Sequence, residues 1–301
     1  MADHRPTVRP ELAGIRTHQV FRDALSYFDV PYAVLPGFRA LVLDLHVPAR
    51  PDGDPAPVVV YAHGGGFFSG TRTMGPWAFL LEAGYAVASV DYRLSGECRF
   101  PGPVHDVAAA VRWVRVHADE YGLDAGRVAG FGSSAGGYLM NAVALASGYP
   151  EIVGGSGETA EPSCDLAAVI DHYAPVDFLH MDEDSGQNGT GPAPGPGSPL
   201  VQFLGFIPSA QPDEAERANL CRYVTAASPP FLIAHGDADG VVGVGQSRRL
   251  RDALAAAGAR AELVVVPGAG HGSPEFDQPG MHDRALAFLE SALIKPANVT
   301  A

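Results

Sequence analysis

Short, strongly apolar and β-branched runs alternate with longer amphipathic stretches along most of this chain. The alternation predicts a mostly parallel sheet covered by helices on both faces, because parallel strands are joined by crossovers long enough to hold a helix. The first expected strand has alternating leucines and is interpreted as an antiparallel edge strand, whereas the later ones are continuous apolar runs typical of buried strands. The sequence thus predicts a doubly wound α/β fold of about eight strands. We expect strands at 40–47, 57–62, 85–91, 127–131, 166–173, 231–235 and 261–266, and helices at 17–28, 103–120, 135–146, 245–257 and 281–293.

Charge and composition exclude several classes of partner. The 301 residues are 47% hydrophobic and 18% charged, which is ordinary for a globular protein with a sizeable core. The net charge of 20 − 34 = −14 disfavours nucleic acid and anionic membranes as partners. With no secretory leader and no apolar run of about 18 residues, we expect no membrane contact and a cytoplasmic location. The three cysteines are too few for a disulfide framework and are expected to be free thiols, although a Cys164–Cys221 pair stays open.

The chain is predicted to form a single domain over 1–301, with 1–38 as an N-terminal extension or partial cap. One stretch departs from the alternating pattern: DSGQNGTGPAPGPGS at 184–198 is rich in glycine and proline. It is too long for an ordinary connection. We interpret 183–200 as a flap insertion or a disordered insert, and not as an interdomain linker, since expected strands continue on both sides.

The strongest chemical signal is G-S-S-A-G at 132–136, between an expected strand and an expected helix. A serine hydroxyl is a weak nucleophile and must stand on a sharp turn where a base can reach it, and flanking glycines let the strand and helix backbones approach. At a helix N-terminus, the next backbone N–H also faces a developing oxyanion. The motif centres on Ser134 and not on its neighbour Ser133. The alternative is a glycine-rich turn without chemistry.

A second signal is H-G-G-G at 63–66, which follows the apolar run VVVYA. Three consecutive glycines weaken the local fold, so they need a reason. The functional reason is a backbone that presents N–H groups to a carbonyl oxygen, and the alternative is a flexible turn. The downstream G-S-S-A-G favours the functional interpretation.

An acid and a histidine follow two late strands in turn, as H-G-D-A-D at 235–239 and G-H-G at 270–272. Together with the upstream serine they stand in the Ser…Asp…His order of the α/β-hydrolase fold. The histidine would accept the serine proton through one ring nitrogen while the acid holds the proton on the other. His271 is the candidate base, and both Asp237 and Asp239 are candidate acids. His63 and His235 open glycine turns and are expected to be structural hydrogen bonders.

These motifs, with HGGGFFSG, DYRLSGECRFPGPVHD, PVDF, HGDADGVVGVGQS and VVPGAGHG, resemble the esterase/lipase branch of the α/β-hydrolase superfamily. The chain is similar to the hormone-sensitive-lipase-like enzymes and more so to the bacterial feruloyl-esterase-like (BD-FAE-like) domains, over about 42–293. The resemblance implies that Ser134 is the nucleophile and His271 the general base and then acid. Its HGxxD pattern selects Asp239 as the orienting carboxylate, which leaves Asp237 to a turn hydrogen bond.

The resemblance also implies an oxyanion hole formed by the backbone N–H groups of Gly65, Gly66 and Ala135. Three departures stand out. GSSAG replaces the GDSAG of the lipase-like relatives, Cys98 lies within the YRL…FP segment, and Gly243 replaces a family proline after the acid. The last change predicts a looser acid loop. None removes a catalytic group.

By this resemblance the chain is a serine carboxylic-ester hydrolase that works through an acyl-enzyme on a small-molecule acetyl or aryl ester, without cofactor. The alternatives are an amidase, peptidase, lactonase or acyltransferase with the same triad, or a ligand-binding protein that has lost catalysis. The sequence does not show the pocket that decides between them. A homodimer also stays open.

Aromatic residues near the motifs are candidates for the substrate pocket, and we expect Phe67, Phe68 and Phe178 to line it. An acidic run with histidines at 171–184 is a second feature to interpret. Its spacing fits no metal template, so we expect no metal there and interpret the run as a solvated loop rim.

Overall fold

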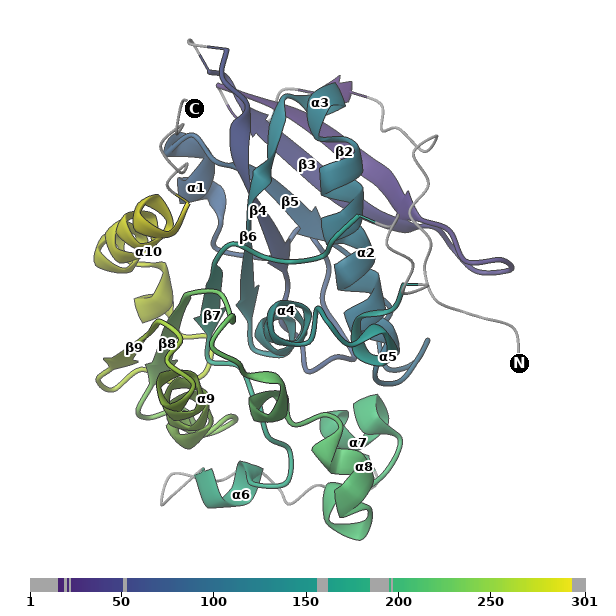
Figure 1. The fold of residues 1–301 in the computed structure, drawn as a ribbon, viewed down its shortest axis with the longest axis vertical. Helices are drawn as coiled ribbons and strands as arrows, with labels where there is room; N and C mark the ends of the chain where they lie inside the picture. The colour runs from purple at the N-terminus through teal and green to yellow at the C-terminus, as the bar shows by residue number, and fades with distance from the viewer. Residues whose placement is uncertain are drawn as a thin grey trace.

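A nine-stranded sheet forms the centre of the described part of the chain, with strand order β1-β2-β3-β5-β4-β6-β7-β8-β9 (Figure 1). The computed structural model describes residues 16–18, 21, 23–50, 53–155, 162–184, 195 and 197–293. The strands, in chain order, are β1 (Arg16–His18), β2 (Ala24–Ala33), β3 (Leu41–Pro48), β4 (Ala56–Ala62), β5 (Ala86–Val90), β6 (Leu123–Ser133), β7 (Val169–His172), β8 (Phe231–Gly236) and β9 (Ala261–Val266).

The sheet is antiparallel from β1 to β5 and parallel from β5 onward through β4, β6, β7, β8 and β9. Every residue of β4 and β5 is buried. This burial explains their continuous apolar sequences, because helices lie on both faces of a parallel sheet. The predicted, mostly parallel α/β architecture is confirmed.

Helices cover both faces of the sheet (Figure 1). Val111, Leu139 and Leu250 from α2, α4 and α9 pack in one core cluster, and Leu80 and Leu289 from α1 and α10 pack in the other. The α-helices are α1 (Ala78–Glu82), α2 (Gly102–Val116), α3 (Ala118–Tyr121), α4 (Ala135–Leu145), α5 (Pro150–Val153), α6 (Met181–Asp184), α7 (Pro199–Leu204), α8 (Pro212–Glu216), α9 (Val244–Ala256) and α10 (Pro279–Ala292). Short 3-10 helices are η2 (Pro208–Ala210), η3 (Leu220–Tyr223) and η4 (Pro274–Asp277).

Two predictions at the N-terminal side are wrong. The chain forms the antiparallel strands β1 and β2 where we expected a helix at 17–28, apart from residues 19, 20 and 22, which lie outside the described ones. In β2, the buried Ala24 and Ser26 flank an exposed Leu25, which is the period of two that pairing with β3 imposes. The strand expected at 40–47 is antiparallel as predicted, but it is not an edge strand because β2 pairs with its outer side. The described part of 1–38 thus adds strands to the sheet, while 1–15 lies outside the described residues.

The segment between β7 and β8 carries α6, α7, η2, α8 and η3, at the end of the sheet where the parallel strands finish (Figure 1). Most of the predicted flap, residues 185–194 and 196, lies outside the described residues. At its ends, Asp184 closes α6 and Ser198 caps α7 by accepting a hydrogen bond from the backbone N–H of Val201. Within the described residues, none of the helices has the length and apolar character needed to cross a bilayer.

Candidate active site

Ser134 stands on a sharp turn between β6 and α4. Its φ of 55° and ψ of −121° lie in a region that non-glycine residues rarely adopt. A Cβ at Gly132 would lie 2.3 Å from the carbonyl oxygen of Gly136, and one at Gly136 would lie 2.1 Å from that of Ala62. Both glycines are therefore required by the close approach of strand and helix, as expected for a nucleophile elbow.

Three side chains from separate loops form one hydrogen-bonded chain. His271 Nε2 lies 2.8 Å from Ser134 Oγ, and His271 Nδ1 lies 2.7 Å from Asp239 Oδ2. A carboxylate only accepts hydrogen bonds, so Nδ1 carries the proton and Nε2 accepts from the serine hydroxyl. This arrangement lets His271 take a proton from Ser134.

The Asp239 side chain is fully buried, and both of its oxygens accept hydrogen bonds. Oδ1 accepts from the backbone N–H groups of Val241 and Val242, at 2.8 and 2.9 Å. Burial alone would raise the pKa of Asp239, but hydrogen bonds from His235 and His271 outweigh it and hold the pKa below its usual value. The carboxylate therefore stays charged beside the His271 ring.

The glycine loop at 63–66 lies against Ser134. A Cβ at Gly64 would lie 3.3 Å from Ser134 Cβ. Gly65 and Gly66 have φ of 124° and 61°, and the Gly65 carbonyl accepts from the N–H groups of Phe68 and Ser69, so the loop folds back on itself. Among the described residues, no backbone carbonyl outside α4 accepts a hydrogen bond from the N–H groups of Gly65, Gly66 and Ala135.

Most of the chain matches one known protein family. The BD-FAE family model matches residues 43–254. This chain belongs to the BD-FAE family. It is 29% identical to Esterase LipC and 31% identical to Esterase LipQ of Mycobacterium tuberculosis, over 90% and 83% of its length. It spans only 65% and 58% of the lengths of these two relatives.

Solved structures show the same fold. One described as a truncated carbohydrate esterase from gut microbiota superposes with a TM-score of 0.79 at 28% identity, covering 91% of this chain and 98% of that one. A thermophilic esterase from Thermogutta terrifontis has a TM-score of 0.65 at 25% identity, covering 85% and 90%. The BD-FAE chain thus has the α/β-hydrolase fold that its motifs predicted.

In this BD-FAE structure, the two residues next to the candidate serine and acid have other contacts. The buried Ser133 lies 3.4 Å from the hydroxyl of Tyr61. Asp237 Oδ1 accepts from the N–H of Gly268 at 2.6 Å, so it joins the loop after β8 to the loop after β9.

His63 has a structural position, as predicted. Its Nδ1–H donates to the carbonyl of Gly64 at 2.7 Å, and its ring stacks on Tyr92 with centroids 4.4 Å apart. The Tyr92 hydroxyl donates to the His63 carbonyl at 2.8 Å. Burial lowers the pKa of His63, so the neutral ring holds the glycine loop in place.

The predicted pocket aromatics separate into two environments. Phe67 and Phe178 are 4% and 3% exposed and belong to a buried aromatic cluster, in which Phe203 stacks on Phe67 at 3.9 Å and Tyr138 contacts both. Phe68, the next residue, is 51% exposed. The cluster therefore belongs to the hydrophobic core, and Phe68 is the one of the three that faces solvent.

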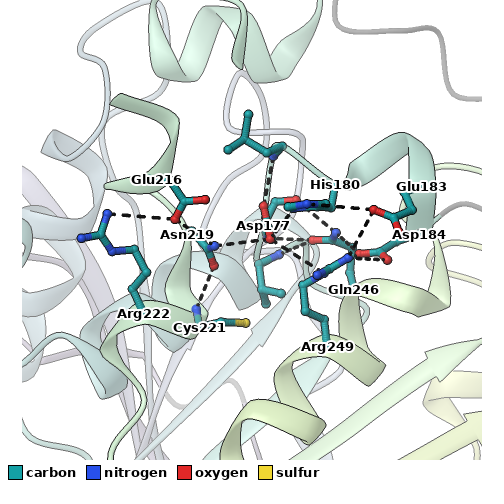
Figure 2. Close-up of polar contacts among 12 residues, drawn as sticks. Asp177, His180, Glu183, Asp184, Glu216, Asn219, Cys221, Arg222, Gln246 and Arg249 are labelled. Carbon is teal, nitrogen blue, oxygen red and sulfur yellow. Dashed lines mark hydrogen bonds and ion pairs between the residues drawn. The ribbon is translucent and has the colours of Figure 1, made fainter. Parts of the chain in front are cut away.

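The acidic run after β7 forms ion pairs and hydrogen bonds instead of an open rim (Figure 2). Asp177 is buried and lies 2.7 Å from His180 Nδ1, and Arg249 of α9 makes a two-pronged contact with Asp184 at 2.9 Å. Asp182 and Glu183 match the expected solvated position: both are exposed, Glu183 at 71% of its side chain. Among the described residues, no cluster of histidine, cysteine and acidic side chains has the arrangement of a metal site.

Sequence reasoning missed Gln246 and Arg249, whose side chains bind this run to α9 (Figure 2). Their partners lie 62 and 65 residues away in the chain. Both residues lie on the first turns of the expected helix at 245–257, but nothing in the sequence shows which residues their side chains contact.

Proposed function

We propose that this BD-FAE family member is a serine carboxylic-ester hydrolase that works through an acyl-enzyme. The observation that carries the proposal is the hydrogen-bonded chain of Ser134, His271 and Asp239, with separations of 2.8 and 2.7 Å. Its position at the end of a parallel sheet, beside a glycine loop, is the arrangement that acyl transfer requires. The names of the similar mycobacterial esterases support the same reaction class.

In the first half-reaction, Ser134 Oγ attacks the ester carbonyl carbon while its proton passes to His271 Nε2. The carbonyl π electrons move to oxygen, and the resulting oxyanion accepts from the N–H groups of Gly65, Gly66 and Ala135. Each such donor contributes about 2.7–4 kcal/mol to lowering the barrier. When the C–O bond breaks, His271 returns the proton to the departing alcohol, which leaves the acyl group on Ser134.

In the second half-reaction, water takes the place of the alcohol. His271 accepts a proton from the attacking water and returns it to Ser134 Oγ as the tetrahedral intermediate collapses, which releases the carboxylic acid and restores the serine hydroxyl. The charged Asp239 stabilises the imidazolium in both halves. All steps use these side chains, the backbone N–H groups and water, so the proposed reaction requires no cofactor.

The proposed substrates are esters with a small acyl group. Phe67, Phe178 and Phe203 pack against one another with at most 4% exposure, so a long acyl chain entering behind the glycine loop would have to displace them. The Thermogutta terrifontis esterase is also known with propionate and with butyrate bound. Phe68, exposed and beside Gly66, is the aromatic residue we expect to touch the acyl or alcohol part.

The test is hydrolysis of p-nitrophenyl esters from acetate to dodecanoate by wild type, Ser134→Ala and the matched control Ser133→Ala. We expect rapid turnover of the short esters, a steep decline with chain length, and loss of turnover only in Ser134→Ala. Turnover that persists in Ser134→Ala would remove the proposed nucleophile. A folded wild type that hydrolyses no ester in the series would reject the ester-hydrolase proposal in favour of amide or acyl-transfer chemistry.

A further inference from the structure

His235 is a buried imidazole with a polar contact at each ring nitrogen. The side chain has 0% exposure. Its Nε2 lies 2.8 Å from the carbonyl oxygen of Val242 and 3.3 Å from Asp239 Oδ2, and its Nδ1 lies 2.7 Å from Ser247 Oγ. The steps proposed above make no use of this residue.

The contacts define which nitrogen carries the proton. A carbonyl and a carboxylate can only accept, so the Nε2 between Val242 and Asp239 must be the donor. Nδ1 then accepts from the hydroxyl of Ser247. Ser247 therefore favours the one tautomer of His235 that donates an N–H to the carbonyl of Val242, with Asp239 Oδ2 3.3 Å from the same nitrogen.

Three hydrogen bonds and the close contact with His235 converge on one carboxylate. The N–H groups of Val241 and Val242 bind Oδ1, while His271 and His235 face Oδ2 from two directions. A carboxylate held by donors on both oxygens cannot rotate about its Cβ–Cγ bond without losing several hydrogen bonds. The orientation of Oδ2 toward His271 is set by this shell.

The glycines in the loop that carries Asp239 restrict its backbone little. Gly240 and Gly243 flank the exposed Val241 and the buried Val242. Gly243 has a φ of −65°, which a proline would impose and a glycine leaves free. The contact from His235 to the Val242 carbonyl compensates, because it binds the middle of this loop to β8.

The partner of His235 is itself firmly held. Ser247 follows Gln246 on the first turns of α9, and both are fully buried. Gln246 Oε1 accepts from the N–H groups of Val176 and Asp177, and its Nε2 donates to the Asp177 carbonyl and to Asp184 Oδ2 (Figure 2). All the hydrogen-bonding capacity of this amide is used, so α9 presents Ser247 to His235 from a fixed position.

From these contacts we infer that His235 is a positioning residue for the triad: its Nε2–H holds the carbonyl of Val242 and so fixes the loop that presents the Asp239 carboxylate to His271. The inference rests on the proposed function for its effect on turnover. Its structural content, the geometry of the Asp239–His271 hydrogen bond, is observable without any substrate.

The experiment compares His235→Asn and His235→Met with the conservative variant His235→Gln. Asparagine keeps an amide near the position of Nδ1 but does not reach the Val242 carbonyl, methionine fills the volume without a donor, and glutamine carries its amide to the position of Nε2. The first readout is the far-downfield proton resonance of His271 Nδ1–H, assigned by its loss in His271→Ala. The second is kcat and KM on a short p-nitrophenyl ester, normalised to folded protein by thermal unfolding.

In His235→Asn and His235→Met we expect the resonance to move upfield and to exchange faster with water. We expect kcat to fall by about 10- to 100-fold, the range for a misplaced catalytic group, with KM changed by less than about twofold. His235→Gln should keep most of the wild-type resonance and most of the wild-type kcat. If the proposed function fails, wild type shows the resonance but no ester turnover, and the resonance in the variants still decides the inference.

Two results would overturn the inference. One is a folded Asn or Met variant that keeps the wild-type resonance and the wild-type kcat. The other is an equal loss in all three variants, which would mean that the imidazole is needed only for packing.

Discussion

His271 Nε2 lies 2.8 Å from Ser134 Oγ although 137 residues separate the two in the chain. The parallel sheet explains the contact, because the loops after β6, β8 and β9 all leave the sheet at the carboxyl ends of its parallel strands. Ser134, Asp239 and His271 each come from one of these loops. The fold therefore assembles the proposed site from residues that no local motif contains together.

Replacing the candidate acid should affect turnover far more than replacing its neighbour. Asp239→Asn removes the charge that stabilises the imidazolium and favours the wrong tautomer of His271, so kcat/KM should fall by about 10⁴-fold. Asp237→Asn changes a contact to the N–H of Gly268 and should leave kcat/KM within about threefold of wild type. Steady-state kinetics on one short ester measures both. A larger loss in Asp237→Asn would mean that the acid has been misassigned.

The glycine loop gives a second prediction. In Gly65→Ala the added Cβ would lie 2.1 Å from the carbonyl oxygen of Ser69, so the loop must shift. We expect kcat to fall by about 10²–10³-fold as oxyanion donors move. Gly37→Ala is the matched control, since Gly37 also has a positive φ, of 76°, but a Cβ there meets nothing within 4 Å. If both variants keep wild-type kcat, the loop does not bind the oxyanion.

Acid stability should depend on His172. Both of its ring nitrogens lack a hydrogen-bond partner among the described residues, and burial lowers its pKa from 6.5 to about 3. Between pH 6.5 and about pH 3, the folded state thus binds fewer protons than the unfolded chain. The stability from the neutral ring is fully present above pH 6.5 and is lost as the pH falls toward 3, at up to about 1.4 kcal/mol per pH unit.

His172→Phe should remove this dependence, because a phenyl ring can pack against Phe131 and Phe276 without titrating. Thermal unfolding of wild type and variant from pH 7 to pH 4 measures the effect. We expect the Tm of His172→Phe to decline less steeply than that of wild type. Parallel curves would contradict the assignment of His172 as a buried neutral imidazole.

The polar cluster of Figure 2 contains a buried contact and a partly exposed one, which should differ in how much they stabilise the fold. Gln246→Met leaves the N–H groups of Val176 and Asp177 buried without an acceptor, so the free energy of unfolding should fall by about 2–4 kcal/mol. Arg249→Gln breaks an ion pair whose arginine is 30% exposed, and screening by water limits the loss to about 1 kcal/mol. Urea denaturation compares the two, and equal losses would contradict this ranking.

Much of the framework could be predicted because it depends on local patterns. The strands β4, β5, β8 and β9 and the helices α4, α9 and α10 follow from apolar runs whose periods are those of strand and helix. The positions of Ser134, Asp239 and His271 follow from the glycine motifs after three strands, and the structure brings the three side chains into contact. Their catalytic roles stay predictions.

The remainder depends on contacts between distant segments. Phe67 and Phe68 are adjacent aromatic residues, yet a φ of 67° at Phe67 accompanies its burial against Phe203, while Phe68 stays exposed. The helix predicted at 17–28 fails for the same reason, because pairing with β3 selects a strand there. The acidic run after β7 is bound to α9 by Gln246 and Arg249, which the sequence alone does not pair with it.

The most direct test of the central claim is reaction with a fluorophosphonate, followed by peptide mass spectrometry. An activated serine displaces fluoride and keeps the phosphonyl group on its oxygen, whatever acyl group the protein prefers. The account predicts a single adduct on Ser134, absent from Ser134→Ala and formed much more slowly in His271→Ala. An adduct on Ser133, or a folded wild type that does not react, would contradict it.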